Sequence, residues 1–543
     1  MYLSLNLRPM RKSFTALGAL LLLLHNTHAQ PAGNPPDTIA HHYAQTIQVP
    51  DLREYLSTLA SDAMEGRETG QPGQKKAAAY IADFFEDQQL TPAVDDTSYL
   101  QCFPIVETAW NKPYMQISKQ RFTLFEDFYA FPALAEPLDT LIDEVTFLGY
   151  GIAGERYDDY RKSDVDGKAI MILSGEPMLR DSSYALSGSY EPSRFSTNFR
   201  AGLEAKYKMA KDRGARVVLV VDENYEENIR RFALYAARPS LRLQSEAASQ
   251  TSLIFISPTM VHALVGKSKL TKAQRRITKK GKPYSFRRST DLTFALRQDV
   301  DRMTSENVLG YLEGSDLKDE LLVITSHYDH IGITGDQINN GADDDGSGTV
   351  GVLELAQAFA TAKAEGHGPR RSILFMTVSG EEKGLFGSEY YTDHPVFPLE
   401  NTIADLNIDM IGRIDPQHQQ DSAYVYIIGS DRLSTELHEI NEAANARYTQ
   451  LDLDYTYNAA DDPNRFYYRS DHYNFAKHGV PIIFYFNGTH ADYHKPTDTV
   501  DKINFDLLRD RTRLVFYTAW ELVNQDKRIE VDVTEGSGSE KIE

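Results

Sequence analysis

Five side chains that can bind a metal ion follow short apolar runs in the second half of the chain. They are His327, Glu381, Glu382, Asp409 and His494. Imidazole nitrogens and carboxylate oxygens are common ligands of zinc, at distances of about 2.0–2.2 Å. Each of these residue types often has a purely structural role when it stands alone. Their recurrence after successive apolar runs therefore predicts one shared metal site.

A glycine-punctuated loop between the first two runs adds further carboxylates. The loop extends from Asn340 to Gly348 and contains Asp343, Asp344 and Asp345. Two metal ions about 3.5–4 Å apart need a carboxylate that both can share. Several acidic ligands must also offset the repulsion between the two ions. Two histidines and three carboxylates meet this need, so the sequence is compatible with a paired site.

The apolar runs themselves indicate how these residues are positioned. Residues 321–325, 373–378, 403–408 and 480–486 are nearly continuous in apolar side chains and rich in β-branched ones. Such runs are typical of buried parallel strands, and helical segments alternate with them. We predict an α/β fold with a mixed, mostly parallel sheet sandwiched by helices. In open sheets of this kind, ligands bind beyond the carboxyl ends of the strands.

Local motifs in this region resemble those of a known family. The motifs are His-x-Asp at 327–329, Gly-Ala-x-Asp-x-x-Ser-Gly at 341–348, Glu-Glu at 381–382, Asp-Met-Ile-Gly at 409–412 and Tyr-His-x-Pro-x-Asp-Thr at 493–499. In this order they resemble the co-catalytic zinc aminopeptidase family, which includes secreted bacterial aminopeptidases and relatives of glutamate carboxypeptidase II. The resemblance covers most of residues 50–130 and 300–525, and the set is specific although no single motif is.

The resemblance implies a role for each metal-binding residue. His327 and Asp409 would bind one Zn²⁺, Glu382 and His494 would bind a second, and Asp344 would bridge the two. The implied cofactor is therefore two Zn²⁺ per chain.

The resemblance also implies roles for residues that do not bind the metals. Glu381 would be the general base, and Asp329 would orient the imidazole of His327 from behind. Tyr493 would polarise the carbonyl group of the scissile bond, with Tyr485 as an alternative.

Two features extend or depart from the family pattern. The loop has Asp343 and Asp345 on either side of Asp344 where many relatives have asparagines, so these two could tune the ligands or bind a further cation. The segment 470–472, Ser-Asp-His, is interpreted as a hydrogen-bond cluster beneath the site.

These observations favour a metal-dependent exopeptidase of the aminopeptidase type, acting on peptide substrates. One alternative is a glutaminyl cyclase-like enzyme, which shares this fold and uses a single zinc. Another is a non-catalytic, peptidase-like binding protein. Both are disfavoured because all five ligand positions are filled. The side-chain preference and the oligomeric state cannot be deduced from the sequence, and the preference for amino-terminal cleavage rests on the resemblance.

The predicted division of the chain places an insertion inside the peptidase domain. We expect a signal peptide at 1–29, a first peptidase segment at 30–134, an insertion at 135–262, a returning linker at 263–304, the main peptidase segment at 305–528 and a disordered tail at 529–543. The insertion is β-rich and resembles a protease-associated domain, on the motifs at 150–152, 157–160, 165–168 and 214–215. The basic segment 266–288 is interpreted as a solvated hinge or hairpin.

The amino-terminal residues predict export. Arg8, Arg11 and Lys12 precede the apolar run 14–24, and the small residue Ala29 follows at the expected cleavage position. This run is too short for a membrane span, and no cysteine lies at the cleavage position to carry a lipid, so we expect no stable membrane anchor.

Composition narrows the compartment and the partners. The net charge of −21 weighs against nucleic acid as a partner. Cys102 is the only cysteine, so an intramolecular disulfide cannot form. An exported chain without disulfides is typical of the bacterial periplasm or exterior.

Overall fold

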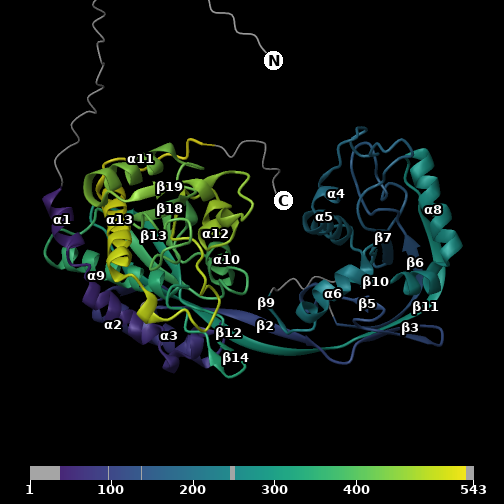
Figure 1. The fold of residues 1–543 in the computed structure, drawn as a ribbon, viewed down its shortest axis with the longest axis horizontal. Helices are drawn as coiled ribbons and strands as arrows, with labels where there is room; N and C mark the ends of the chain where they lie inside the picture. Colours follow the sequence, from purple (N-terminus) through teal and green to yellow (C-terminus); the bar gives the residue numbers. More distant parts are fainter. Residues whose placement is uncertain (1–36, 96, 136, 245–250, 534–543) are drawn as a thin grey trace, which may run out of the picture.

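The computed structural model describes residues 37–95, 97–135, 137–244 and 251–533. These residues form two lobes, each built around its own β-sheet (Figure 1). The predicted signal peptide lies outside the described residues, so export stays a prediction. Within the described ranges, no helix combines the length and the apolar character that a membrane span requires.

The first lobe contains the predicted parallel strands. Four neighbouring strands run in the same direction: β20 (Ile482–Phe486), β17 (Thr402–Ile408), β13 (Leu317–His327) and β16 (Arg371–Val378). They match the four apolar runs, which confirms the predicted fold class. Six more strands complete the sheet: β1 (Thr91–Pro92), β2 (Leu100–Trp110), β9 (Ser240–Leu243), β12 (Gln298–Leu312), β18 (Tyr424–Ile428) and β19 (Asp452–Asp454).

Helices cover both faces of this sheet, which explains why its central strands are apolar throughout. Alternate residues of a strand point to opposite faces. Leu322 and Ile324 of β13 pack in one core cluster, while Leu321 and Val323 pack in another. The first cluster includes α1 (Thr38–Ala44), α2 (Val49–Leu59), α3 (Pro72–Asp87), α9 (Gly346–Ala364), α11 (Thr435–Ala444) and α13 (Phe505–Asn524). The second includes α10 (Phe386–Asp393) and α12 (His472–Ala476).

The second lobe contains a mixed sheet of eight strands, with four parallel strands at its centre. The strands are β3 (Tyr114–Ile117), β4 (Gln120–Thr123), β5 (Phe128–Tyr129), β6 (Leu138–Phe147), β7 (Ala169–Leu173), β8 (Val217–Val221), β10 (Ser252–Ile256) and β11 (Phe286–Leu296). Its helices are α4 (Arg194–Thr197), α5 (Phe199–Lys211), α6 (Tyr225–Ala236), α7 (Pro258–Val265) and α8 (Lys267–Lys280). The likeness of this lobe to a protease-associated domain stays a prediction.

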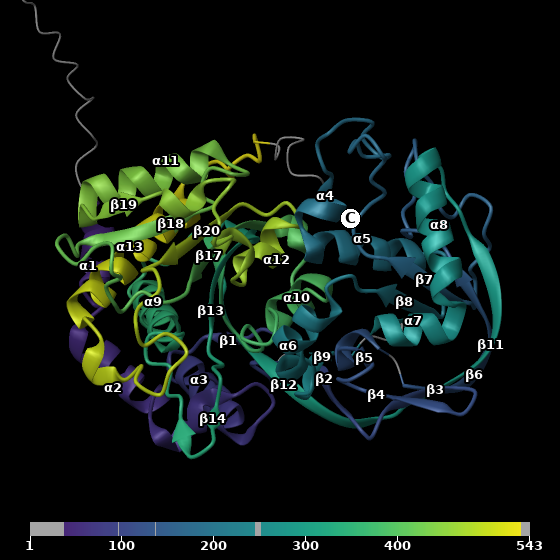
Figure 2. The same cartoon turned by 45° about the vertical axis from the view of Figure 1, so that its right-hand side comes forward.

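The second sheet extends beyond the predicted insertion of residues 135–262. Strands β3 and β4 precede that range and β11 follows it, yet β11 pairs with both β3 and β6. The two lobes are joined by β2 and β12, which pair antiparallel from Leu100 opposite Val308 to Trp110 opposite Gln298 (Figure 2). Because these long strands belong to the first sheet and lead into the second, no change in composition marks the boundary.

The local structure differs from two sequence-based interpretations. The basic segment 266–288 is not a hinge, because its first part forms α8. Leu270, Ala273 and Ile277 are buried on one face of this helix, at the spacing of an amphipathic helix. Similarly, residues 529–533 of the predicted tail are ordered, while residues 534–543 lie outside the described residues. Ile529 is buried, and the backbone N–H of Val533 donates to the carbonyl of Leu433 over 3.3 Å.

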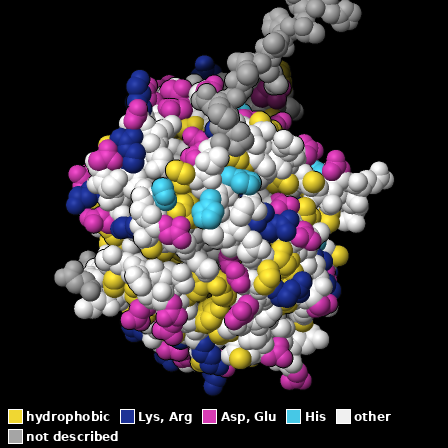
Figure 3. Space-filling view, turned by 90° about the vertical axis from the view of Figure 1, so that its left-hand side faces the viewer, with side chains coloured by type: hydrophobic (Ala, Val, Ile, Leu, Met, Phe, Trp, Pro, Cys, Tyr) yellow, Lys and Arg dark blue, Asp and Glu magenta, His cyan; other side chains and the backbone are white. Residues whose placement is uncertain are grey.

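The surface of the first lobe, on the side away from the second lobe, shows no basic stripe. Figure 3 shows Lys and Arg side chains scattered among Asp and Glu side chains on this face.

One buried arginine ties the amino-terminal helices to the sheet. Arg67 ends the short 3₁₀ segment η1 (Asp62–Arg67) between α2 and α3 and is only 1% exposed. Its guanidinium donates to the carbonyl oxygens of Leu59, Tyr328, Asn340 and Gly341 over 2.6–2.9 Å. These four carbonyls come from the end of α2, the residue after β13 and the glycine-punctuated loop.

We expect Arg67→Met to lower the free energy of unfolding by about 3 kcal/mol or more, because several buried carbonyls would lose their donor. Urea unfolding followed by circular dichroism measures the change. Arg200→Met is the matched control, since Arg200 is exposed and pairs only with Glu204 on the surface. Equal stability of the two variants would contradict this role for Arg67.

Candidate metal centre

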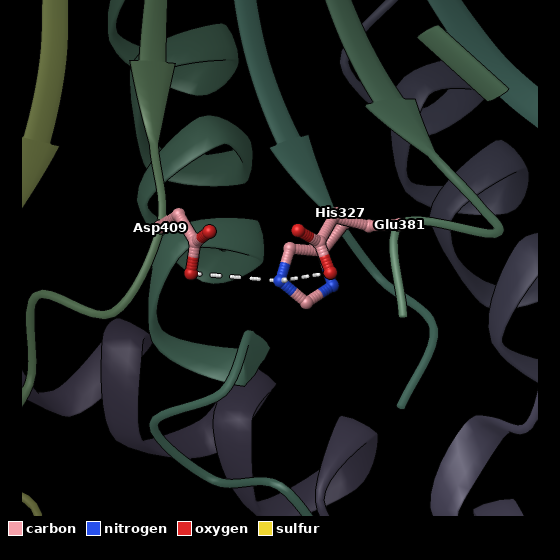
Figure 4. A group of neighbouring side chains, drawn as sticks. All are labelled: His327, Glu381 and Asp409. Carbon is pink, nitrogen blue, oxygen red and sulfur yellow. Dashed lines mark ion pairs between the residues drawn. The ribbon is translucent and has the colours of Figure 1, made fainter. Parts of the chain in front are cut away.

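Two predicted ligands, His327 and Asp409, and the predicted general base, Glu381, converge at the carboxyl ends of the parallel strands. His327 is the last residue of β13, Asp409 follows β17 directly, and Glu381 comes three residues after β16. Figure 4 shows these three side chains pointing toward one another, with the imidazole between the two carboxylates. Nε2 of His327 lies 3.5 Å from Oδ1 of Asp409 and 3.9 Å from Oε2 of Glu381.

The two oxygens of Asp344 face two different histidines. Its Oδ1 lies 3.4 Å from Nε2 of His327, and its Oδ2 lies 3.1 Å from Nε2 of His494. His494 in turn lies 3.1 Å from Oε2 of Glu382. All five predicted ligands therefore come together, and Asp344 occupies the central position that a shared carboxylate requires.

The acidic neighbours of Asp344 bind backbone groups. Oδ1 of Asp343 accepts from the N–H of Gly412 over 2.7 Å. Oδ1 of Asp345 accepts from the N–H of Gly348, which caps α9, and from that of Met410. These hydrogen bonds hold the residues that follow Asp409 against the start of α9. A Cβ at position 348 would collide with the carbonyl of Ile408, so only glycine allows this approach.

The loop that carries His494 is fixed by charged contacts. His494 has a φ of 57°, which is unfavourable for a residue with a side chain and must be imposed by its surroundings. Arg413 lies 2.8 Å from Asp492, and Lys502 lies 2.7 Å from the same carboxylate. Asp498 accepts from the backbone N–H groups of Asp343 and Asp344. The loop is thereby held against the residues that present Asp344.

Asp329 contacts His327 in a different way from the one the resemblance implied. Nδ1 of His327 lies 3.0 Å from the backbone carbonyl of Asp329, whereas the Asp329 carboxylate is 3.8 Å away. The carboxylate instead accepts from the hydroxyl of Thr69 over 2.6 Å and from the backbone N–H of Glu381 over 3.2 Å. It therefore positions the Glu381 backbone as well as lying behind the imidazole.

The amino-terminal segment contributes to the site in a way that sequence reasoning missed. Besides Thr69, Glu68 forms an ion pair of 2.8 Å with Lys383, which follows Glu382 directly. Glu68 and Thr69 lie in the segment between α2 and α3, to which sequence reasoning assigned no role. Long-range pairing of this kind has no local signal in the sequence.

His330 is a second residue that sequence reasoning missed. It is fully buried, and its Nδ1 lies 2.9 Å from Oε1 of Glu382 and 3.7 Å from Oδ2 of Asp344. Together with these two carboxylates it could hold a metal ion, as could the group of His327, Glu381 and Asp409. The sequence feature that could have indicated this role is the position of His330 three residues after His327, just past the end of the same strand.

The two tyrosine candidates lie in different environments. Tyr493 lines the cavity at the metal centre, and its ring stacks on His494 with centroids 3.8 Å apart. Burial raises the pKa of Tyr493 above the usual range, so its hydroxyl keeps its proton. Tyr485 packs in the core of the first lobe, where its hydroxyl donates to Asn441 over 2.8 Å. Only Tyr493 of these two faces the cavity.

The segment 470–472 forms a hydrogen-bond cluster behind Asp409. The hydroxyl of Ser470 donates to Oδ2 of Asp409 over 2.7 Å and accepts from Asn407 over 2.9 Å. Asp471 accepts from Ser388 over 2.5 Å, and Nε2 of His472 lies 2.8 Å from the carbonyl of Tyr467. This is the arrangement expected from the sequence.

The site has a strong negative potential that favours cations. Burial lowers the pKa of His494, but contacts with Asp344 and Glu382 outweigh it and raise the pKa to about 10. Burial raises the pKa of Glu381 well above its usual range, although His327 opposes this. Within the described chain, Oδ2 of Asp344 and Oε1 of Glu382 are buried with no hydrogen-bond donor beside them except the nearby histidine nitrogens. Carboxylate oxygens left in this way fit divalent ions.

Comparisons with known proteins agree with this geometry. Aminopeptidase YwaD of Bacillus subtilis (strain 168) is 25% identical over 233 residues, which is 41% of this chain and 46% of that protein. Aminopeptidase NAALADL1 of Mus musculus is 32% identical over 128 residues, or 23% of this chain and 16% of that protein. The chain thus spans less than half the length of these two curated relatives.

A solved structure shares the fold over nearly the whole chain. The aminopeptidase from Aneurinibacillus sp. strain AM-1 superposes with a TM-score of 0.51 at 18% identity, covering 91% of this chain and 98% of that one. The sequence model of the family described as "Peptidase family M28" matches residues 307–519, which contain all five predicted ligands. This match confirms the resemblance seen in the motifs: residues 307–519 are similar to peptidase family M28.

Proposed function

We propose that this chain is a metal-dependent exopeptidase of the aminopeptidase type that binds two zinc ions and removes residues from the amino terminus of peptides. The observation that carries the proposal is the position of Asp344, whose two carboxylate oxygens face His327 on one side and His494 on the other. A carboxylate shared between two groups of ligands is what a paired metal site requires.

The residues present fit two zinc ions. His327 and Asp409 would hold one ion, Glu382 and His494 would hold the other, and Asp344 would contact both. Imidazole and carboxylate ligands suit zinc, and the buried oxygens of Asp344 and Glu382 lack other hydrogen-bond partners among the described residues. Bound zinc lowers the pKa of water and polarises a carbonyl group.

Glu381 is positioned to move the proton. It lines the cavity beside His327 without belonging to the proposed ligand set. An ionised carboxylate at this position can accept a proton from the attacking water and later pass it to the leaving amine. The carboxylate of Asp329 accepts a hydrogen bond from the backbone N–H of Glu381. This bond holds the backbone from which the Glu381 side chain extends.

Tyr493 is positioned to donate a hydrogen bond to the substrate. Its hydroxyl remains protonated at neutral pH and its ring lies against His494 in the cavity wall. A donor aimed at the scissile carbonyl stabilises the negative charge that develops on the oxygen during attack.

We expect Asp344→Ala to abolish the binding of both zinc ions, because it removes the one carboxylate that faces both sides. Asp409→Ala should lose only the ion beside His327. Zinc per chain is measured by elemental analysis after dialysis, with the exposed Asp461→Ala as the matched control. Two zinc ions retained in Asp344→Ala would contradict the bridging role, and one ion in the wild-type chain would favour the cyclase-like alternative.

Glu381→Gln should keep two zinc ions but lower kcat by about 10²–10⁴-fold, since it removes the group that accepts the proton. The rates of release of p-nitroaniline from aminoacyl p-nitroanilides, with zinc content measured on the same samples, provide the test. Glu400→Gln, which changes an exposed carboxylate on the same lobe, is the control. A Glu381→Gln rate equal to that of the wild type would remove Glu381 from the mechanism.

A further inference from the structure

Arg469 lies on the wall of the cavity that contains the metal centre. The same cavity is lined by His327, Asp344, Glu381 and Asp409. Among the described residues that line it, Arg469 is the only lysine or arginine. A single fixed cation beside the reacting groups is therefore available to any substrate that enters.

The guanidinium of Arg469 has no acidic partner within the described chain, whereas two basic residues beside the metal ligands do. Lys383 pairs with Glu68 and Arg413 pairs with Asp492. No carboxylate of the described residues lies within ion-pair distance of its guanidinium. Instead its guanidinium carbon lies 4.9 Å from the centroid of the Phe466 ring. A solvated cation of this kind can pair with an incoming anion without first breaking an internal salt bridge.

The backbone holds Arg469 in a fixed place relative to the metal centre. Its N–H donates to the carbonyl of Phe466 over 3.0 Å, which closes a short turn. The next residue, Ser470, donates to Oδ2 of Asp409 over 2.7 Å. The backbone that carries the Arg469 side chain is therefore anchored to the metal centre through the next residue.

The remaining wall of the cavity is largely apolar. Met410, Phe466, Phe484 and Phe486 line it and are nearly inaccessible to solvent. A substrate that fills this space would exclude water from around Arg469, and ion pairs strengthen as the local dielectric falls. Planar guanidinium groups bind carboxylates through two parallel hydrogen bonds.

We propose that Arg469 binds a carboxylate group of the peptide substrate and makes the enzyme favour substrates that carry one next to the scissile bond. This inference rests on the proposed exopeptidase function. Two parts of a substrate can supply the carboxylate: an acidic side chain on the amino-terminal residue, or the free carboxyl terminus of a dipeptide.

The first test compares glutamyl p-nitroanilide with glutaminyl p-nitroanilide, which differ only in the charge of the side chain. The variant Arg469→Gln should lower the ratio of kcat/KM for the glutamyl over the glutaminyl substrate by roughly tenfold, because it removes a charge-assisted pair. Arg469→Lys should restore part of this ratio. Arg465→Gln is the matched control, since Arg465 lies four residues away, packs on Tyr468 and does not line the cavity.

The second test compares the dipeptide Leu-Gly with leucyl-glycinamide, which lacks the terminal carboxylate. If Arg469→Gln lowers the ratio of kcat/KM for Leu-Gly over leucyl-glycinamide but leaves the glutamyl-to-glutaminyl ratio unchanged, Arg469 binds the carboxyl terminus of the dipeptide. If it lowers only the glutamyl-to-glutaminyl ratio, Arg469 binds the acidic side chain. Binding of free glutamate and free glutamine, measured by calorimetry on the zinc-loaded protein, gives a readout that does not depend on turnover.

The proposal is overturned if Arg469→Gln leaves both ratios unchanged, or if Arg465→Gln lowers them equally. A uniform loss on charged and neutral substrates would also overturn it, because it would mean that Arg469 supports the site in general. If the zinc-loaded wild-type chain hydrolyses none of the four substrates, the exopeptidase function itself fails, and this inference fails with it.

Discussion

Buried carboxylates at one edge of a sheet are the constraint on which the rest of this structure depends. Asp344, Glu382 and Asp409 are largely removed from water and lie within a few ångströms of one another through the histidines between them. Anions this close in a low-dielectric setting repel each other strongly. The arrangement is stable only if cations or hydrogen-bond donors offset this repulsion. Divalent metal ions do so, and the same ions supply the chemistry that a hydrolase needs.

Segments far apart in the chain hold this edge together. Arg67 joins the end of α2 to the carbonyls beside His327 and the Asp344 loop. Asp345 joins the start of α9 to the residue after Asp409, and Asp498 joins the His494 loop to the backbone of Asp344. Each contact links two elements that carry different ligands. The geometry of the centre is therefore a property of the whole first lobe.

Much of this lobe could be predicted from local patterns, because buried parallel strands are short apolar runs and their carboxyl ends gather the functional residues. The contribution of Thr69 could not, since it depends on a long-range contact that no spacing rule records. His330 was missed although its position three residues after His327 was a signal. Helix α8 was not predicted, because its many basic residues drew attention away from the helical spacing of the apolar positions 270, 273 and 277. The extent of the second lobe was missed because β2 and β12 are long strands that pass from one lobe to the other.

The most direct test of the paired metal centre is a crystal structure of the zinc-loaded chain with anomalous diffraction data collected on both sides of the zinc edge. The account predicts two anomalous peaks about 3.5–4 Å apart. One should lie between His327, Asp344 and Asp409, and the other between His494, Asp344 and Glu382. A single peak, or peaks away from Asp344, would contradict it.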